Sequence, residues 1–175
     1  WSSDVCSSDL LGKTHWSDTN RVMLRNRRIG CSVSGVAQFI TKHGMEELRK
    51  WLEEGYDTIQ DWDCIYSDWF AIPKSIKTTS VKPSGTVSLL AGATPGLHYP
   101  ESRFYIRRMR LSNQSDLIEP LEKAGYKLEP AFGSEDTTMV VEVPVDVGEG
   151  IRTAKELSIW EQFSLAAFMQ RHWAD

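Results

Sequence analysis

Stretches with helical spacing alternate with stretches rich in β-branched residues along this chain, and this alternation constrains its fold more than any other feature. Three short stretches predict strands because β-branched and aromatic residues are dense in them: Ile76–Lys82, Phe104–Leu111 and Thr137–Val145. Strands that alternate with helices are typical of an α/β architecture. We therefore expect an α/β fold, with no domain boundary within residues 11–175.

Apolar residues that recur at three- and four-residue steps predict the helices. A helix from Val36 is expected to be interrupted at Gly44 and to end at Gly55, and further helices are expected over Ile59–Phe70, Val87–Ala91 and Leu117–Ala124. The last predicted helix opens with Ser158 and Glu161, which form a capping box, and runs to Trp173. Because that helix is apolar nearly all round, we expect it to be buried.

Composition excludes several classes of function. The chain has 175 residues, 41% of them hydrophobic, and a net charge of −4, so its overall charge favours neither nucleic acid nor an anionic membrane as a partner. No apolar run has the length of a membrane span, and the chain does not start with a signal peptide. The cysteines Cys6, Cys31 and Cys64 match no zinc or redox spacing. We expect free thiols, no metal site and a cytoplasmic location.

The first ten residues, WSSDVCSSDL, differ from the rest of the chain. They repeat the tripeptide Ser-Ser-Asp and have no amphipathic period, so they resemble translated sequencing adaptor more than a native polar tail. The chain also begins at Trp1 without a methionine and stops at Asp175 directly after an apolar pattern. We expect residues 1–10 to be a non-native tail and residues 11–175 to be a fragment of a larger domain.

The segment that carries chemistry is the turn from the strand at Ile76–Lys82 into a short helix. It consists of Pro83, Ser84, Gly85, Thr86, Val87 and Ser88. A helix N-terminus presents unpaired N–H groups, glycine lets an anion approach the backbone, and the three hydroxyl side chains can add donors. The segment can therefore cradle a phosphate, although it is no Walker loop because the Gly-Lys-Ser/Thr ending is absent. An ordinary capped helix start would have the same local chemistry.

A longer resemblance favours the phosphate cradle. The string SIKTTSVKPSGTVSLLAGATPGLHYP, from Ser75 to Pro100, closely resembles the phosphate-loop region of cobalamin-dependent ribonucleoside-triphosphate reductases. RNRRIGCSVSG, YIRRMRL and WEQFSLAAFMQRHWAD resemble flanking segments of the same family, in the same order. The resemblance covers about residues 11–175.

This resemblance implies an enzyme that replaces the ribose 2′-hydroxyl with hydrogen. The family's fold is a ten-stranded α/β barrel, and its thiyl radical is generated with adenosylcobalamin. The substrate is a ribonucleoside triphosphate, and a thioredoxin-type protein or a dithiol supplies the reducing equivalents. The radical cysteine and its glutamate lie in an Asn-Pro-Cys-x-Glu motif that is absent here, so no catalytic residue is expected in this fragment. The residues implied to bind substrate phosphates are Pro83, Ser84, Gly85, Thr86, Val87 and Ser88.

Other polar residues have simpler interpretations. Cys31 is expected to pack at the start of a helix, and Cys64 to lie within one. Strand alternation places Arg108 and Arg110 on one face and Arg107 on the other, and we expect a solvated or ion-paired set. His98 and Tyr99 follow the loop and have either a structural role or a place in the site.

Two alternatives remain open from the sequence. One is a fragment of a diphosphate reductase with another radical source. The other is a stand-alone phosphate-binding α/β module without redox activity.

Overall fold

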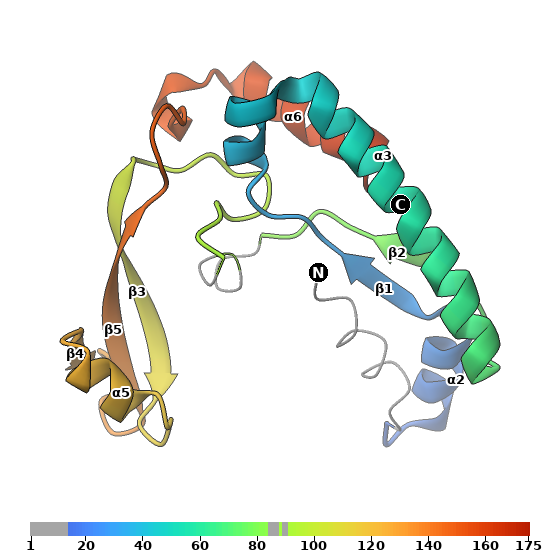
Figure 1. Cartoon of the computed structure of the whole chain (residues 1–175). Helices are drawn as coiled ribbons and strands as arrows, with labels where there is room; N and C mark the ends of the chain where they lie inside the picture. The colour runs from blue at the N-terminus through green and yellow to red at the C-terminus, as the bar shows by residue number, and fades with distance from the viewer. Residues whose placement is uncertain (1–13, 84–87, 89–90) are drawn as a thin grey trace. The chain divides into compact units, whose positions relative to one another are not determined.

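The computed structural model describes residues 14–83, 88 and 91–175 (Figure 1). The chain divides into two compact units. One unit comprises the chain up to Pro100 together with Gly150–Asp175, and the other comprises Glu101–Glu149. No linker-like composition marks either boundary, so the expectation of an undivided chain does not anticipate this division.

A β-α-β unit organises the first part of the chain. Strand β1 (Arg28–Cys31) pairs in parallel with β2 (Lys77–Thr79), and helix α3 (Val36–Phe70) connects them. Parallel strands need a crossover connection of this kind, because a tight turn can join only antiparallel neighbours. Strand β2 lies within the predicted strand Ile76–Lys82 but is shorter. The helix α2 (Ser17–Asn26) precedes β1, and Arg27 joins the two in a left-handed conformation with φ of 39°.

Helix α3 is interrupted where the sequence predicts it, but it does not end where the sequence predicts. The backbone of Gly44 is non-helical, with φ of 82° and ψ of 172°, which confirms the interruption. The helix then continues through Gly55 to Phe70, so Gly55 is no C-cap. The side chains of Leu48 and Leu52 are buried before it, and Asp63 and Ser67 after it. Tertiary packing on both sides thus outweighs the weak helix propensity of one glycine.

The core of this unit lies between α3 and helix α6 (Ile159–His172). Its buried members are Val36, Leu48, Leu52, Leu165, Met169 and Trp173. Ser158 begins α6 with the predicted capping box, because its hydroxyl accepts the Glu161 amide and the Glu161 carboxylate accepts the Ser158 amide. The expectation that α6 is buried all round is wrong. Its first turns expose large side chains, and the exposed fractions of Ile159, Trp160 and Phe163 are 62%, 76% and 61%.

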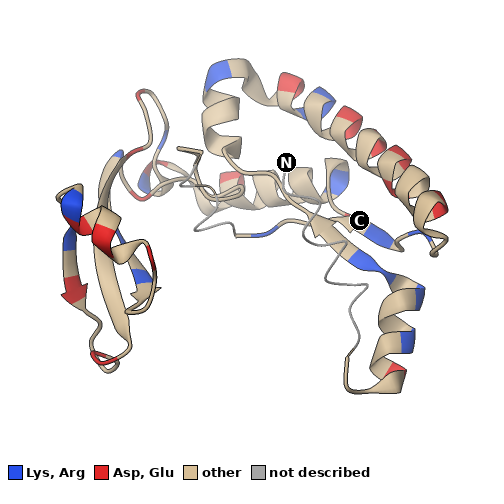
Figure 2. Cartoon of the chain, turned by 60° about the horizontal axis from the view of Figure 1, so that its bottom comes forward, with Lys and Arg blue, Asp and Glu red and all other residues tan. Residues whose placement is uncertain are grey.

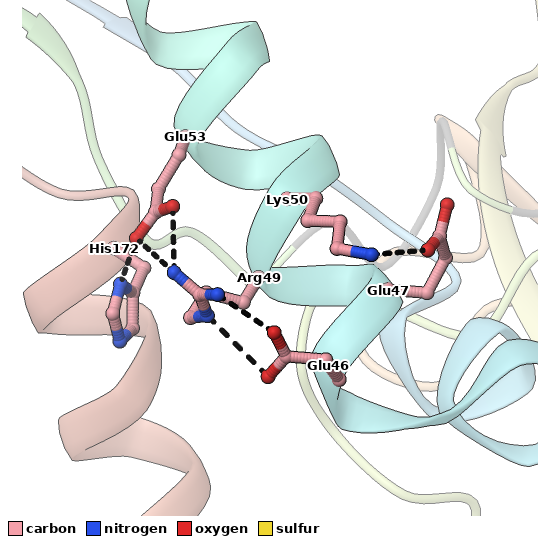
Figure 3. A network of polar contacts seen from close by, with 6 residues as sticks. All are labelled: Glu46, Glu47, Arg49, Lys50, Glu53 and His172. Atoms are coloured by element: carbon pink, nitrogen blue, oxygen red, sulfur yellow. Dashed lines mark hydrogen bonds and ion pairs between the residues drawn. The ribbon is translucent and has the colours of Figure 1, made fainter.

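A polar network adds to the contact between the two helices (Figure 3). The Nδ1 atom of His172 on α6 lies 2.9 Å from Oε1 of Glu53 on α3. Arg49 donates to the same glutamate, at 3.0 Å, and to Glu46 one turn earlier, at 2.7 Å. The hydrogen bond with Arg49 lowers the pKa of Glu46. Figure 2 shows that charged residues continue along α3, as expected for a helix with one solvent-facing side.

The second unit is an antiparallel sheet with one short helix. Its elements are β3 (Phe104–Ser112), α5 (Ile118–Lys123), β4 (Lys127–Pro130) and β5 (Thr138–Asp146). The strand order is β3-β5-β4, and the register pairs Arg108 with Glu142. The predicted strands at Phe104–Leu111 and Thr137–Val145 are confirmed, as is the helix that ends before Gly125. That glycine has φ of 81°.

The described residues therefore form a mixed α/β structure, as expected. Four short elements have no counterpart in the sequence prediction: α2, β1, β4 and the 3₁₀ turn η1 (Ala154–Glu156). Within the described residues, none of the helices combines the length and the hydrophobicity of a membrane span.

Candidate functional site

The predicted phosphate loop is described at its two ends only. Pro83 is exposed and follows β2, and Ser88 is helical and 2% exposed. Ser84, Gly85, Thr86 and Val87 lie outside the described residues, so the predicted convergence of their N–H groups stays a prediction. The carbonyl of Ser88 accepts the amides of Ala91 and Ala93, at 3.2 and 2.9 Å. The chain therefore turns sharply just after the loop, as the predicted stop at Gly92, with φ of 61°, requires.

Close packing against glycines holds the entry to the loop. A Cβ atom on Gly96 would lie 2.5 Å from the Lys82 carbonyl oxygen, and Gly96 has φ of 53°. A Cβ on Gly30 would lie 2.7 Å from Oγ of Ser80 and 3.0 Å from the end of the Lys82 side chain. The amide of Lys82 donates to Oγ of Ser32, at 3.2 Å. Two separate segments, residues 30–32 and the turn at Gly96, thus fix the chain immediately before Pro83.

The N-terminus of α3 holds the exit from the loop. The side chain of Gln38 donates to the Gly92 carbonyl at 3.0 Å and accepts the Thr94 amide at 2.9 Å. In return, the carbonyl of Thr94 accepts the Gly35 amide at 2.8 Å, and the carbonyl of Gly96 accepts the Val36 amide at 3.4 Å. These carbonyls satisfy donors that a helix start leaves unpaired. The turn at Pro95 and Gly96, which was predicted, is confirmed.

The segment after α6 contacts the strand that leads to the loop. The carboxylate of Asp175 accepts the amides of Thr78 and Thr79, and the indole of Trp173 donates to the Ser80 carbonyl. Partial burial by itself would raise the pKa of Asp175, but the hydrogen bonds from Thr78, Tyr56 and Thr79 outweigh it and lower the pKa to about 2.

A buried arginine fastens the start of the β-α-β unit. Arg27 is 2% exposed, and its Nη1 atom donates to Ser67 Oγ and to the Pro73 carbonyl, both at 2.8 Å. The same atom lies 3.9 Å from Asp63, whose carboxylate accepts the amide and the hydroxyl of Ser75. The network closes the link between the end of α3 and β2, so it sets where β2 begins.

The arginines of β3 are at least partly ion-paired, as expected. Arg108 contacts Glu129 on β4 and lies 3.5 Å from Glu142 on β5. Tyr99 packs against the core, where burial raises its pKa, and the His98 amide donates to the Pro95 carbonyl. These contacts give Tyr99 a structural role.

Neither of the two described cysteines is in a disulfide. Cys31 ends β1 and packs against the core, so its predicted place at the start of a helix is wrong although its packing role is confirmed. Cys64 lies within α3, and its hydrogen bond with Lys74 raises the pKa of that lysine. Among the residues that the structure describes, no group of three His, Cys, Asp or Glu side chains is arranged to hold a metal ion.

Comparison with known proteins identifies close relatives. No family model matches the chain. An adenosylcobalamin-dependent ribonucleoside-triphosphate reductase of Euglena gracilis is 61% identical over 161 residues, which are 92% of this chain and 22% of the relative. A probable adenosylcobalamin-dependent ribonucleoside-triphosphate reductase of Dictyostelium discoideum is 59% identical over 165 residues, 94% of this chain and 22% of the relative. The chain thus spans about a fifth of the length of these relatives.

A solved structure agrees with the sequence matches. The crystal structure of a B12-dependent, class II ribonucleotide reductase superposes with a TM-score of 0.75 at 30% identity. The match covers 97% of this chain and 28% of that structure.

Proposed function

Because this chain belongs with the adenosylcobalamin-dependent ribonucleoside-triphosphate reductases over a fifth of their length, we propose that it is part of the catalytic α/β barrel of such an enzyme. Within that barrel, its segment Pro83–Ser88 binds the phosphates of a ribonucleoside triphosphate. Residues 11–175 form the barrel part, and the complete barrel has ten strands. Residues 1–10 are a tail foreign to it.

The observation that carries the proposal is the fixation of the loop at both ends. Lys82 is held by Ser32 and by its contact with Gly96, and the chain after the loop is held by Gln38. A binding segment whose ends are already fixed loses little conformational entropy when the ligand arrives. Such pre-organisation is what a phosphate cradle made of backbone N–H groups requires.

The remaining chemistry belongs to the complete enzyme. The relatives in Euglena gracilis and Dictyostelium discoideum are named as adenosylcobalamin-dependent, and this cofactor would supply the radical that starts thiyl-radical reduction of the ribose. The cofactor carries its own cobalt, so it needs no cluster of metal ligands from the protein. The contacts among the described residues assign no residue to cofactor binding. A dithiol or a thioredoxin-type protein provides the reducing equivalents. The sequence contains no Asn-Pro-Cys-x-Glu motif, so this chain by itself is expected to form no deoxynucleotide.

The diphosphate reductase remains the second candidate within the same chemistry. The names of the relatives favour the triphosphate, since each specifies a ribonucleoside-triphosphate reductase. The same names disfavour a stand-alone phosphate-binding module.

The test is nucleotide binding by the complete reductase with changes inside the loop. Thr86→Ala removes one hydroxyl donor and is expected to raise Kd for the triphosphate by roughly 10- to 150-fold, since a hydrogen bond to a charged group contributes roughly 1.5–3 kcal/mol. Gly85→Val is expected to weaken binding further, because its side chain blocks the approach of the phosphate.

Thr58→Ala is the control, because Thr58 is an exposed helical threonine whose hydroxyl donates to the Glu54 carbonyl of its own helix. If Gly85→Val binds both the triphosphate and the diphosphate with wild-type affinity, the loop is only a helix start and does not bind phosphate. Tighter binding of diphosphate than triphosphate by the unaltered enzyme would favour the second candidate.

A further inference from the structure

The carboxylate of Asp175 accepts hydrogen bonds from both β2 and α3. Its Oδ2 atom accepts the Thr78 amide at 2.5 Å, the Thr78 hydroxyl at 3.0 Å and the Thr79 amide at 3.1 Å. Its Oδ1 atom accepts the hydroxyl of Tyr56 on α3, at 2.6 Å. Four donors on two elements thus converge on one side chain.

Neighbouring contacts extend this attachment along the strand. Lys77 Nζ donates to the Asp175 carbonyl at 2.6 Å, and Gln60 on α3 donates to the Thr78 hydroxyl at 2.8 Å. Trp173, which is 1% exposed, donates from its indole to the Ser80 carbonyl at 3.3 Å. The segment that follows α6 therefore holds the backbone at Thr78, Thr79 and Ser80 and the side chain of Lys77.

The held strand runs directly into the phosphate loop. Only Ser80, Val81 and Lys82 separate Thr79 from Pro83. The amide of Ser80 is bonded to the Cys31 carbonyl and that of Lys82 to Ser32, so β1 fixes the other side of the same stretch. The position of Pro83 then depends on β1 on one side and on Asp175 with Trp173 on the other, in addition to the contact between Lys82 and Gly96.

We infer that Asp175 is a positioning residue for substrate binding, one that acts through β2 on the phosphate loop. The inference rests on the proposed function of Pro83–Ser88. Among the described residues, Asp175 bonds to Tyr56, Lys77, Thr78 and Thr79 and to neither Pro83 nor Ser88. Its loss would therefore leave the loop's own donors present but less well ordered. The substrate would have to order them on binding, which weakens affinity without altering the chemical step.

The experiment measures KM and kcat of the complete reductase with three variants. Asp175→Ala removes all four hydrogen bonds and is expected to raise KM for the triphosphate by about tenfold, with kcat changed by less than about twofold. Asp175→Asn keeps one carbonyl acceptor and is expected to show a partial rise in KM, because an amide oxygen has only two lone pairs for the three β2 donors. Tyr56→Phe removes the one hydrogen bond that the Asp175 carboxylate accepts from α3, and it is expected to raise KM by about twofold.

Glu161→Ala is the matched control. Its carboxylate also accepts several hydrogen bonds, from Arg152 and Ser158, which lower its pKa to about 2 as in Asp175. It lies on α6 and contacts neither β2 nor the residues that hold the loop ends. We expect its KM to equal that of the wild type, even where its thermal midpoint falls as much as that of Asp175→Ala.

The outcomes separate the inference from the proposed function. If Gly85→Val leaves nucleotide affinity unchanged, the proposed function fails and takes the inference with it. If Gly85→Val weakens binding while the Asp175 variants match Glu161→Ala in KM, the inference alone is wrong. If Asp175→Ala does not fold, Asp175→Asn and Tyr56→Phe decide, and wild-type KM in both overturns the inference.

Discussion

The carbonyl oxygen of Lys82 lies against Gly96, 2.5 Å from the point where a β-carbon on that glycine would stand. This contact joins the residue before the proposed phosphate loop to the turn after it. Gly96→Ala should destabilise this chain by about 1–3 kcal/mol, because the new methyl group meets backbone that cannot move aside and the residue also has positive φ. Urea unfolding followed by circular dichroism measures the loss.

Gly92→Ala is the control for this change. Gly92 also has positive φ, 61°, but a Cβ there would meet nothing within 4 Å. Gly92→Ala therefore introduces backbone strain but no steric clash, so its loss in the free energy of unfolding should be clearly smaller than that of Gly96→Ala. Equal losses in the two variants would show that the approach of Lys82 to Gly96 is not what requires glycine.

Gln38 should be needed for the segment that follows the loop. Gln38→Ala leaves the Thr94 amide and the Gly92 carbonyl without their partner, and Thr94 is fully buried. We expect a loss of about 1–3 kcal/mol in the free energy of unfolding, the cost of leaving a buried polar group unpaired. Gln162→Ala, an exposed change on α6, should stay within about 0.5 kcal/mol of the wild type. Gln38→Glu keeps the acceptor for Thr94 but loses the donor to Gly92, so an intermediate loss is expected.

Arg27 and Asp63 should depend on each other. Both side chains are almost fully buried, so removing one leaves the other charge without compensation. We expect Asp63→Asn and Arg27→Met each to destabilise the chain by about 3–5 kcal/mol. The double variant should lose markedly less than the sum, and a double-mutant cycle measures the difference. Strict additivity would mean that Ser67, Pro73 and Ser75 carry the whole effect.

The capping box of α6 should make stability depend on acid pH. The hydrogen bonds from Arg152 and then from Ser158 lower the pKa of Glu161 from 4.5 to about 2. Since the folded-state pKa is depressed, this stabilisation is complete above about pH 5 and is lost as the pH falls through 4.5 towards 2. In thermal unfolding between pH 7 and pH 2, Glu161→Gln should have a lower midpoint at pH 7 and a shallower decline in acid.

Glu54→Gln provides the comparison for that titration. Glu54 is an exposed glutamate of α3 for which the structure gives no side-chain hydrogen bond or ion pair. Its variant should follow the wild-type curve at every pH. A Glu161→Gln curve that runs parallel to the wild type over the whole range would contradict the assignment.

The elements that sequence predicts well are those with a strong local signal. The capping box at Ser158, the break at Gly44 and the stop at Gly125 each depend on the conformational preference of one or two residues. The long strands β3 and β5 carry enough β-branched residues to be seen alone. Strand β1 is missed because its four residues include a charged side chain and a glycine, and only its pairing with β2 makes it a strand.

The support of the candidate site is not predictable in the same way. Gln38 lies 54 positions from Gly92, and Asp175 lies 97 from Thr78. No spacing rule relates such residues, because their contact follows from how α3 and α6 pack. The prediction that the start of α6 is buried is wrong for a related reason. An apolar sequence indicates that a helix face can be buried, but it does not identify the segment that packs against it.

The burial of Trp173 has a spectroscopic consequence. Among the tryptophans that the structure describes, Trp16, Trp51, Trp62, Trp69 and Trp160 are 47–76% exposed, whereas Trp173 is 1% exposed and bonded to the Ser80 carbonyl. An indole surrounded by side chains emits at shorter wavelength than one in water and is shielded from iodide. Among these six described tryptophans, Trp173 should therefore give most of the short-wavelength emission that resists the quencher. That emission should report on whether the end of α6 packs against the strand.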